Sequence, residues 1–301
     1  MPFDIMMPFY GRFDHLKLAV ESVLAQSNDD WRLVIVDDVN PDEEPGRWAA
    51  AIADPRVTYL RNEQNLGVSR NYRKCVELMT SDFGMLMGCD DVLLPGFVER
   101  VHALTARFPE ASIIQPGVRV IDADGKGIRP LADRVKALYR PHGRNPRTYE
   151  GEQLATSLLR GNWTYFPSLV WRAEVIREIG FRLDLNVVQD LAMLLEIAKR
   201  GGSLVLDDEV VFAYRRHSTS VSSVTGPDGS KFRQERTVFY EAAADLSALG
   251  WTRGARVARR YLSSRLNAMT ELPGAIRAAD PNGRRVLASH ILGRAYPADR
   301  D

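Results

Sequence analysis

Short apolar runs alternate with segments of helical spacing through the first hundred residues, and this alternation limits the possible folds more than any other feature. The apolar runs, which we interpret as strands, cover residues 3–8, 31–36, 57–60 and 83–87. The segments between them, in which apolar residues recur every three or four positions, are predicted helices at 14–26, 44–52 and 69–79. Strands that alternate with helices predict an α/β protein with a Rossmann-like, mostly parallel central sheet. Ligands of such sheets bind beyond the carboxyl ends of the strands.

The alternation becomes less regular after a helix that opens at Pro95. We expect extended chain at 113–121 and a mobile loop in the polar stretch 128–147, which is rich in Arg, Pro and Gly. Further helices are predicted at 150–159, 173–179 and 191–200, and further strands at 168–171, 203–206 and 210–214. The tail that begins at Gly226 is predicted to be chiefly helical, with one apolar stripe formed by Val257, Ala258, Tyr261, Leu262 and Leu266.

The composition excludes several classes of function. The 301 residues include 40 Lys+Arg and 39 Asp+Glu, and this balance provides no field for holding nucleic acid. The two cysteines, Cys75 and Cys89, are too few for a disulfide framework or a cysteine-rich zinc site. Because the chain lacks an apolar run of membrane-spanning length and a signal-peptide profile at its start, we expect a cytoplasmic protein.

Four arginines of the tail lie mostly off its apolar stripe, at positions 253, 256, 259 and 260. Two interpretations follow. They form either the solvated face of a packed helix or a weak peripheral contact with anionic lipid at the inner face of the membrane.

Two acidic pairs follow strands of the predicted sheet. Asp37 and Asp38 end one apolar run, and Asp90 and Asp91 follow another. Neighbouring carboxylates repel each other unless a cation or hydrogen-bond donors offset the charge, so a divalent metal is one interpretation, and a solvated turn or helix cap is another. Two such pairs at one edge of a sheet favour a ligand that places a sugar or base at one pair and a metal-bound diphosphate at the other.

Neither common nucleotide-binding loop is present, because the sequence has no P-loop and no Gly-x-Gly-x-x-Gly after a strand. Four segments, in order, instead resemble the nucleotide-binding half of family 2 glycosyltransferases. They are Asp-Ile-Met-Met-Pro-Phe-Tyr-Gly-Arg from residue 4, Leu-Val-Ile-Val-Asp-Asp from residue 33, Asn-Leu-Gly-Val-Ser-Arg-Asn from residue 65 and Gly-Cys-Asp-Asp-Val-Leu-Leu-Pro from residue 88. The resemblance continues through 167–172, 188–193 and 214–220 and covers about residues 1–224.

This resemblance implies a glycosyltransferase-A fold and an inverting, metal-dependent transfer of a sugar from a nucleoside-diphosphate sugar. It divides the chain into a catalytic domain at 1–224, with a nucleotide-sugar-binding half at 1–107 and an acceptor-binding half at 108–224, and a C-terminal helical extension at 225–301. A UDP-sugar is the favoured donor, and Mn²⁺ or Mg²⁺ is the expected cofactor. The expected acceptor is a hydroxyl of a saccharide, a lipid-linked molecule or a natural product.

The resemblance also assigns donor and metal residues by their positions in the motifs. Asp90 matches the second aspartate of the family's metal-binding Asp-x-Asp, and Asp91 is a further metal candidate. The first aspartate is replaced by Gly88, which removes one expected carboxylate. The other positions that match the donor site are Pro8, Phe9, Tyr10, Asp38, Asn65, Gly67, Asn71 and Cys89.

On the acceptor side, Asp190 matches the family's general base, which takes the proton of the attacking hydroxyl. From its position alone, an aspartate at a helix start would be a cap. Gln189 stands where relatives carry a glutamate and, with Trp163, is expected to contact the acceptor.

Three residues late in the resemblance are candidates for the metal and diphosphate. His217 resembles a histidine that approaches the metal in relatives, although a lone histidine in a polar turn is more often a surface residue. Arg215 and Arg216 are candidates for holding the diphosphate, or ordinary surface charges.

Two other functions are open at this point. A non-catalytic sugar-nucleotide-binding protein would explain the altered Asp-x-Asp, whereas the aspartate at position 190 argues against it. A sugar-nucleotide pyrophosphorylase shares the overall architecture, but it needs a glycine-rich, Arg-containing loop directly after the first strand, and residues 8–13 do not form one.

Overall fold

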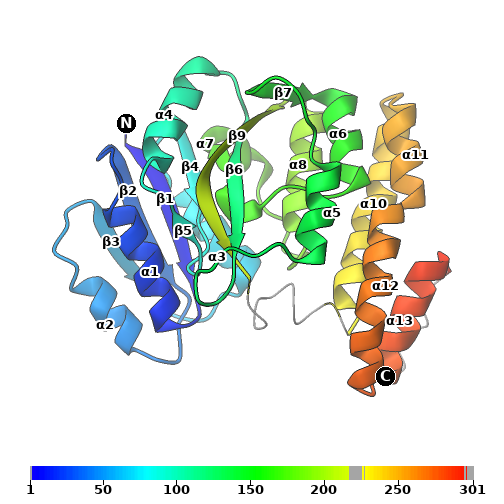
Figure 1. Cartoon of the computed structure of the whole chain (residues 1–301), viewed down its shortest axis with the longest axis horizontal. Helices are drawn as coiled ribbons and strands as arrows, with labels where there is room; N and C mark the ends of the chain where they lie inside the picture. The colour runs from blue at the N-terminus through cyan, green and yellow to red at the C-terminus, as the bar shows by residue number, and fades with distance from the viewer. Residues whose placement is uncertain (1, 217–225, 227, 295, 297–301) are drawn as a thin grey trace.

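In the part of the chain that the structure describes, nine strands form one mixed sheet in the order β3-β2-β1-β4-β8-β6-β9-β5, with β7 paired to β9 (Figure 1). The structure is a computed structural model, and it describes residues 2–216, 226, 228–294 and 296. Helices cover both faces of this sheet, and a helical tail packs at one side (Figure 1).

The first four strands pair in parallel, as the alternation predicts. They are β1 (Phe3–Phe9), β2 (Trp31–Asp37), β3 (Val57–Arg61) and β4 (Phe83–Leu86). The helices between them are α1 (Phe13–Leu24), α2 (Glu44–Ala50) and α3 (Val68–Glu77). Because both faces are covered, β1 and β2 are buried almost throughout, with Met6 and Val34 in one core and Ile5 and Leu33 in the other. The expected α/β fold is confirmed.

Antiparallel and parallel strands mix in the second half of the sheet. Its strands are β5 (Val92–Leu93), β6 (Ile113–Ile121), β7 (Arg147–Glu150), β8 (Val170–Arg172) and β9 (Ser203–Arg215). Its helices are α4 (Phe97–Arg107), α6 (Gly151–Arg160), α7 (Ala173–Ile179) and α8 (Gln189–Lys199), with a 3-10 turn η1 (Phe166–Ser168).

One long strand, β9, replaces the two strands predicted at 203–206 and 210–214. The pairing of β6 with β9 shifts register on both sides of Gly117. A β-carbon at Gly117 would lie 2.5 Å from the carbonyl oxygen of Glu209, so the glycine permits a close approach that bends the strand without ending it.

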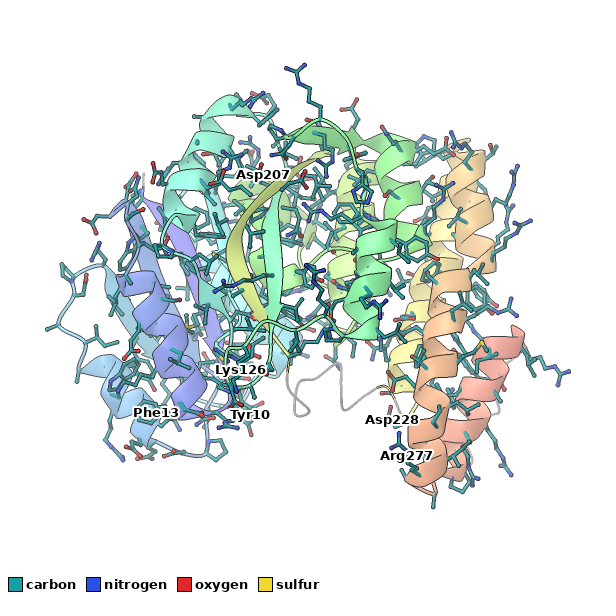
Figure 2. The ribbon with its side chains drawn as sticks, viewed as in Figure 1. Tyr10, Phe13, Lys126, Asp207, Asp228 and Arg277 are labelled. Atoms are coloured by element: carbon teal, nitrogen blue, oxygen red, sulfur yellow. The ribbon has the colours of Figure 1, made fainter. Side chains whose placement is uncertain are left out.

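A helix, α5 (Leu131–Tyr139), forms where the sequence predicts a loop. The chain after α5 is attached to β9 by ion pairs, since Arg140 and Arg147 both bind Asp208 (2.8 and 2.7 Å). Asp207, which pairs with Arg100, lies at the end of the sheet opposite Tyr10 (Figure 2). The polar residues of this stretch therefore stabilise a fixed helix and its exit.

Four helices form the tail: α10 (Ser230–Ala248), α11 (Thr252–Arg260), α12 (Leu262–Arg277) and α13 (Pro281–Leu292). The predicted single stripe is wrong, because Tyr261 takes a left-handed conformation between α11 and α12. Ala258 and Tyr261 are buried, whereas Leu262 and Leu266 are about half exposed. Among the described residues, no helix is both long enough and apolar enough to cross a membrane.

Candidate active site

The loop after β2 brings three predicted donor residues into one hydrogen-bonded network. The buried carboxylate of Asp38 accepts hydrogen bonds from the side-chain amide of Asn62 (2.7 Å) and from the backbone N–H groups of Leu66 (2.7 Å) and Gly67 (2.9 Å). Asn65 donates to the Asp38 carbonyl (2.8 Å). Gly67 has φ +75°, which explains why a glycine is needed directly before α3.

Asn71 joins the same network from the first turns of α3. Its side-chain oxygen accepts from Asn62 (3.0 Å), and its amide donates to the carbonyl of Val36 (3.2 Å). Lys74 donates to Asn62 as well (2.7 Å). Asn62, at the end of β3, is thus a central residue that our motif comparison missed, because it lies just before the matching segment.

The first acidic pair is not a metal site. Asp37 is buried and accepts from the Tyr59 hydroxyl (2.6 Å), the Arg61 guanidinium (2.6 Å) and the backbone N–H of Asn40 (2.7 Å). These donors offset its charge, so Asp37 joins β2 to β3.

Of the three predicted donor residues at the end of β1, one has an exposed side chain. Tyr10 is 57% exposed, and Pro8 is partly exposed. Phe9 is fully buried in the core, because strand alternation turns it inward, so its side chain does not face the donor site to which its motif position assigns it. Its backbone carbonyl instead accepts from the N–H of Asp38 (2.9 Å) and fixes the donor loop.

The turn of Asp90 and Asp91 is held by Arg215 at the end of β9. The backbone N–H of Arg215 donates to Asp91 Oδ1 (2.8 Å), and its guanidinium donates to the carbonyl of Asp90 (2.6 Å). The same guanidinium donates to the carbonyls of Asp122 and Ala123 (3.1 and 2.8 Å). Arg215 is therefore buried and occupied within the protein, which corrects its prediction as a diphosphate ligand.

Because Gly88 has no side chain, the carboxylates of Asp90 and Asp91 occupy the space beside its α-carbon. A β-carbon added at Gly88 would lie 2.5 Å from Asp91 Oδ2 and 2.8 Å from Asp90 Oδ1. Asp91 Oδ2 is buried and has no hydrogen-bond partner among the described residues. Burial, and then the charge of Asp90, raise the pKa of Asp91 well above its usual value.

These oxygens fit a hard divalent cation, because a cation would offset both the orphaned oxygen and the repulsion between the carboxylates. Within the described ranges there is no group of three or more His, Cys, Asp or Glu side chains that could hold a metal. Burial, and then the charge of Asp90, raise the pKa of the Cys89 thiol, so this environment favours the neutral form of Cys89. The predicted metal residue His217 lies outside the described residues.

Asp190 lies in the first turn of α8 and is partly exposed. The amide of Asn162 donates to Asp190 Oδ2 (3.1 Å), and the Thr164 hydroxyl donates to Asn162 Oδ1 (2.8 Å). The N-cap position of α8 is Val188, and the side chain of Asp190, in the first turn, is oriented by Asn162 of another segment.

Two predicted acceptor residues lie inside the protein. Gln189 is 5% exposed, and its Oε1 accepts from the hydroxyl of Ser69 (2.5 Å), which joins α8 to α3. Trp163 is 1% exposed and donates to the Ser157 hydroxyl (3.1 Å). The predicted acceptor contacts of both side chains are therefore wrong for this structure: these residues support the wall that carries Asp190.

The inner side of α5 adds a charged group next to Asp190. Lys136 donates to the carbonyl of Thr164 (2.6 Å), and burial, followed by the charge of Arg216, lowers its pKa to about 8. Arg216 itself pairs with Asp133 of α5 (2.6 Å), which also accepts from the Tyr165 hydroxyl (2.9 Å). Arg216 is thus committed to α5 in this structure, contrary to its prediction as a diphosphate ligand.

Two tyrosines connect the acidic turn to the Asp190 wall. Burial, and then the charges of Asp90 and Asp190 among others, raise the pKa of the Tyr72 hydroxyl, so both carboxylates lie within electrostatic range of one phenol. Burial and the carboxylates of Asp91, Asp90 and Asp133 likewise raise the pKa of Tyr214.

Direct contacts link these two sets of polar residues through α5. Arg215 holds the acidic turn, and the next residue, Arg216, pairs with Asp133 of α5. Lys136 of the same helix donates to Thr164, whose hydroxyl donates to the Asn162 that binds Asp190.

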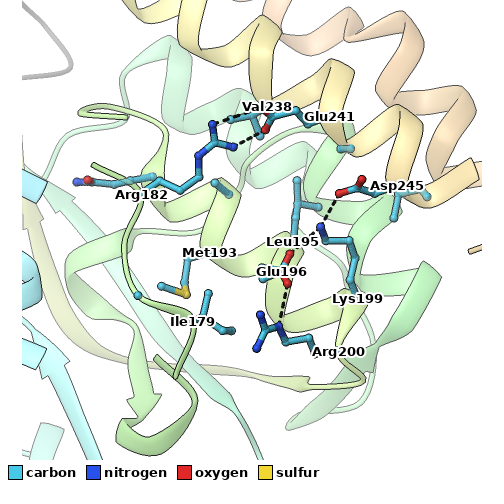
Figure 3. Close-up of a pocket in the computed structure, with 15 residues that line it drawn as sticks. Ile179, Arg182, Met193, Leu195, Glu196, Lys199, Arg200, Val238, Glu241 and Asp245 are labelled. Atoms are coloured by element: carbon cyan, nitrogen blue, oxygen red, sulfur yellow. Dashed lines mark hydrogen bonds and ion pairs between the residues drawn. The ribbon is translucent and has the colours of Figure 1, made fainter. Parts of the chain in front are cut away.

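A separate hollow of about 240 Å³ lies between α8 and α10 (Figure 3). Gln189 lines it and Asp190 does not. Its charges are paired with each other: Arg182 binds Glu241, and Lys199 binds Asp245 and Glu196. This hollow thus joins the tail to the sheet domain, and it is not the site formed by the acidic turn and Asp190.

Comparisons with known proteins agree with this arrangement. The succinoglycan biosynthesis protein ExoO of Rhizobium meliloti is 24% identical over 216 residues, which cover 71% of this chain and 61% of that protein. The TarS 1–349 structure from S. aureus in complex with UDP-GlcNAc superimposes with a TM-score of 0.63 at 12% identity, over 99% of this chain and 93% of that one. The mannosyltransferase PcManGT from Pyrobaculum calidifontis, in complex with GDP-Man and Mn²⁺, gives a TM-score of 0.62 at 14% identity, over 95% and 78% of the two chains.

The model of the family described as glycosyl transferase family 2 matches residues 4–165, more than half of the chain. That range includes the donor network around Asp38, the acidic turn, and Asn162 beside Asp190. The chain belongs to glycosyl transferase family 2 and is a glycosyltransferase that uses a nucleotide sugar.

Proposed function

We propose that this protein is an inverting, metal-dependent glycosyltransferase that moves one sugar from a nucleoside-diphosphate sugar, with a UDP-sugar favoured, to a hydroxyl of a glycan or natural-product acceptor. The observation that carries the proposal is the orphaned, buried oxygen of Asp91 in the acidic turn, together with the Asp190 carboxylate that Asn162 orients. The leaving diphosphate needs positive charge or hydrogen-bond donors beside it, and the attacking hydroxyl needs a base that takes its proton. Both groups must be present in one site.

Asp38, Asn65, Gly67 and Asn71 bind and orient the donor in this proposal. Hydrogen bonds within the protein fix their loop. Tyr10 supplies an exposed ring at the same edge of the sheet for the base. A preorganised loop loses little conformational entropy when the donor binds, which favours affinity.

Asp90, with Asp91 behind it, would hold Mn²⁺ or Mg²⁺ at the diphosphate. When bound, such an ion offsets the negative charge of the departing phosphate. The support is the orphaned oxygen of Asp91 and the oxygen-only donor set. Solved structures with the same fold were obtained with UDP-GlcNAc and with GDP-Man and Mn²⁺, and this agrees with a nucleotide-sugar donor and a divalent ion.

Asp190 takes the proton from the acceptor hydroxyl as the oxygen attacks the anomeric carbon. Asn162 holds Oδ2, and Oδ1 has no hydrogen-bond partner in the described part of the chain, so that oxygen is available to the acceptor. Inversion follows because the base and the leaving diphosphate lie on opposite sides of the transferred sugar.

The test is release of nucleoside diphosphate from a panel of UDP-, GDP- and dTDP-sugars with Mn²⁺. Transfer, or slow hydrolysis, is expected with one of these donors. Asp190→Asn should reduce turnover by at least a hundredfold and leave nucleotide affinity within about twofold. Asp184→Asn is the matched control, because Asp184 is an exposed carboxylate paired with Arg182. Equal turnover in both variants would remove Asp190 from the mechanism.

Metal dependence has a separate readout. Titration calorimetry should find weaker nucleoside-diphosphate binding after EDTA treatment and in Asp90→Ala, with no metal effect left in the variant. Binding without any turnover would indicate the non-catalytic alternative. Release of inorganic pyrophosphate in place of nucleoside diphosphate would indicate a pyrophosphorylase.

A further inference from the structure

A second hollow, of about 400 Å³, lies on the outside of the molecule where α5 and α6 end against α11 and α12. Its floor is apolar and consists of Tyr139, Leu159, Val257 and Leu262. Its remaining wall carries four arginines, at positions 160, 253, 256 and 260, and no acidic side chain lines it. We call this surface the arginine groove.

The sequence of α11 explains how the arginines come to this face. Gly254, Ala255 and Ala258 are buried, and a β-carbon at Gly254 would lie 3.3 Å from Thr156 of α6. The small residues bring α11 close to α6, so the long side chains must point outward. Positions 253, 256 and 260 share one helix face by their spacing, whereas Arg259 turns toward α10 and donates to Ser247 (2.7 Å).

The four guanidinium groups of the groove are exposed and unpaired within the described part of the chain. The side chains of Arg160, Arg253, Arg256 and Arg260 form no ion pair or hydrogen bond there, whereas the arginines that line the hollow between α8 and α10, Arg182 and Arg200, each bind carboxylates. The whole chain has a formal charge of only +1, so this concentration of positive charge is local. Clustered arginines repel each other, and an anionic partner would offset that repulsion.

Exposed apolar side chains extend the groove on both sides. On α5 these are Leu131 and Leu138, which are 63% and 80% exposed. On α12 they are Leu262, Leu266 and Met269, each about half exposed and spaced along one face of the helix. Figure 1 shows α5 and α12 on the same side of the molecule. A surface that combines protruding leucines with unpaired arginines has the composition of an interfacial lipid-binding face.

We propose that the arginine groove and the exposed leucines of α5 and α12 dock the protein on the surface of an anionic lipid bilayer. The arginines lie at the level of the lipid phosphates, and the leucines enter the boundary with the acyl chains. The charge complementarity argues for a membrane, because a neutral apolar partner would leave four guanidinium groups without counter-charge. Since the inner side of α5 carries Lys136 beside Asp190, docking would bring the acceptor wall within one helix of the lipid.

Vesicle co-sedimentation tests the proposal with the full chain. We expect binding to vesicles of 70% phosphatidylcholine and 30% phosphatidylglycerol, little binding to pure phosphatidylcholine, and weaker binding at 0.5 M NaCl. Each arginine near an anionic surface contributes about fivefold in affinity, so Arg256→Glu/Arg260→Glu should weaken binding by more than tenfold. Leu138→Ser/Leu262→Ser should weaken it in the same lipids.

Lys17→Glu/Arg107→Glu is the matched control, with the same change in charge on α1 and α4 at the other side of the molecule (Figure 1). All substituted side chains are exposed, and unchanged melting temperatures verify the fold. Equal binding by the control and groove variants, or no binding to anionic vesicles, overturns the proposal. Release from vesicles by 10 mM inorganic phosphate at constant ionic strength also overturns it, because the groove would then be a phosphate pocket.

Discussion

The side-chain amide of Asn162 donates a hydrogen bond to Asp190 Oδ2 across 3.1 Å, and it belongs to a short relay that reaches α5. Lys136 donates to the carbonyl of Thr164, and the Thr164 hydroxyl donates to Asn162. The relay fixes the amide orientation of Asn162, so its N–H faces the carboxylate. It thereby selects one rotamer of a partly exposed aspartate in the first turn of α8.

Replacing Asn162 by Ala should therefore lower the rate of transfer without weakening the binding of the nucleotide-sugar donor. Loss of a hydrogen bond to a charged group costs about 1.5–3 kcal/mol, which corresponds to a fall in kcat of roughly 10- to 100-fold. The KM for the donor should change by less than about twofold, because the donor loop lies on α3 and β2. Steady-state kinetics checks this, with Asn267→Ala on α12 as the control. A rise in KM at constant kcat would contradict a positioning role.

Gly88 should tolerate no side chain. Gly88→Ala forces a methyl group to within 2.5 Å of the buried Asp91 Oδ2, and overpacking of this kind costs about 1–3 kcal/mol. Thermal unfolding should record a lower melting temperature, and the stabilisation by Mn²⁺ should shrink because both carboxylates move. Gly96→Ala is the control, since nothing lies within 4 Å of its β-carbon position. Equal melting temperatures for the two variants would show that the turn has spare room.

The sequence was most informative where a local motif also determines the local structure. Asp38, Gly67 and Asn71 were predicted together, and they meet because the loop between β3 and α3 is short and closes onto the end of β2. Motif matching did not separate side chains that face a ligand from those that face the core. Phe9 and Trp163 match motifs, but their side chains are buried. The register of β1 turns Phe9 inward, and the packing of α6 buries Trp163, and neither can be read from a motif.

The residues that the sequence could not supply come from long-range packing. Asn162 reaches Asp190 across 28 positions, and Lys136 reaches Thr164 from a stretch that reads as a polar loop. The outer side of α5 is apolar and exposed at Leu131 and Leu138, so its hydrophobic pattern does not mark a buried face. Its helical form depends on the inner contacts of Asp133 with Arg216 and Tyr165.

Lys136 should give the transfer reaction an alkaline limb near pH 8. Burial lowers its pKa to about 8, so the ammonium is charged below that pH and neutral above it. The charge strengthens the bond to the Thr164 carbonyl that supports the relay, so activity should fall as the pH rises through 8. Lys136→Arg stays charged and should shift the limb upward by at least one pH unit, whereas Lys136→Met should be slow at every pH. Unchanged profiles in both variants would exclude Lys136 from the relay.

The stability of the tail should depend on pH through His290. This histidine belongs to α13 and is fully buried, and its ring nitrogens lie 2.7 Å from the hydroxyls of Ser264 on α12 and of Tyr296. Burial, and then the charges of Arg236 and Arg265, lower its pKa to about 3. The unfolded chain takes up a proton near pH 6.5 and the folded chain does not, so the contribution to stability is complete above pH 6.5 and declines as the pH falls toward 3. The decline is at most about 1.4 kcal/mol per pH unit.

Thermal unfolding at pH 7 and pH 5 checks this prediction. Wild type should lose more stability between these pH values than His290→Gln, whose amide does not titrate. The difference in stability between the two proteins should therefore be smaller at pH 5. Parallel losses in both proteins would show that His290 takes up its proton in the folded tail at the same pH as in the unfolded chain, which contradicts the lowered pKa.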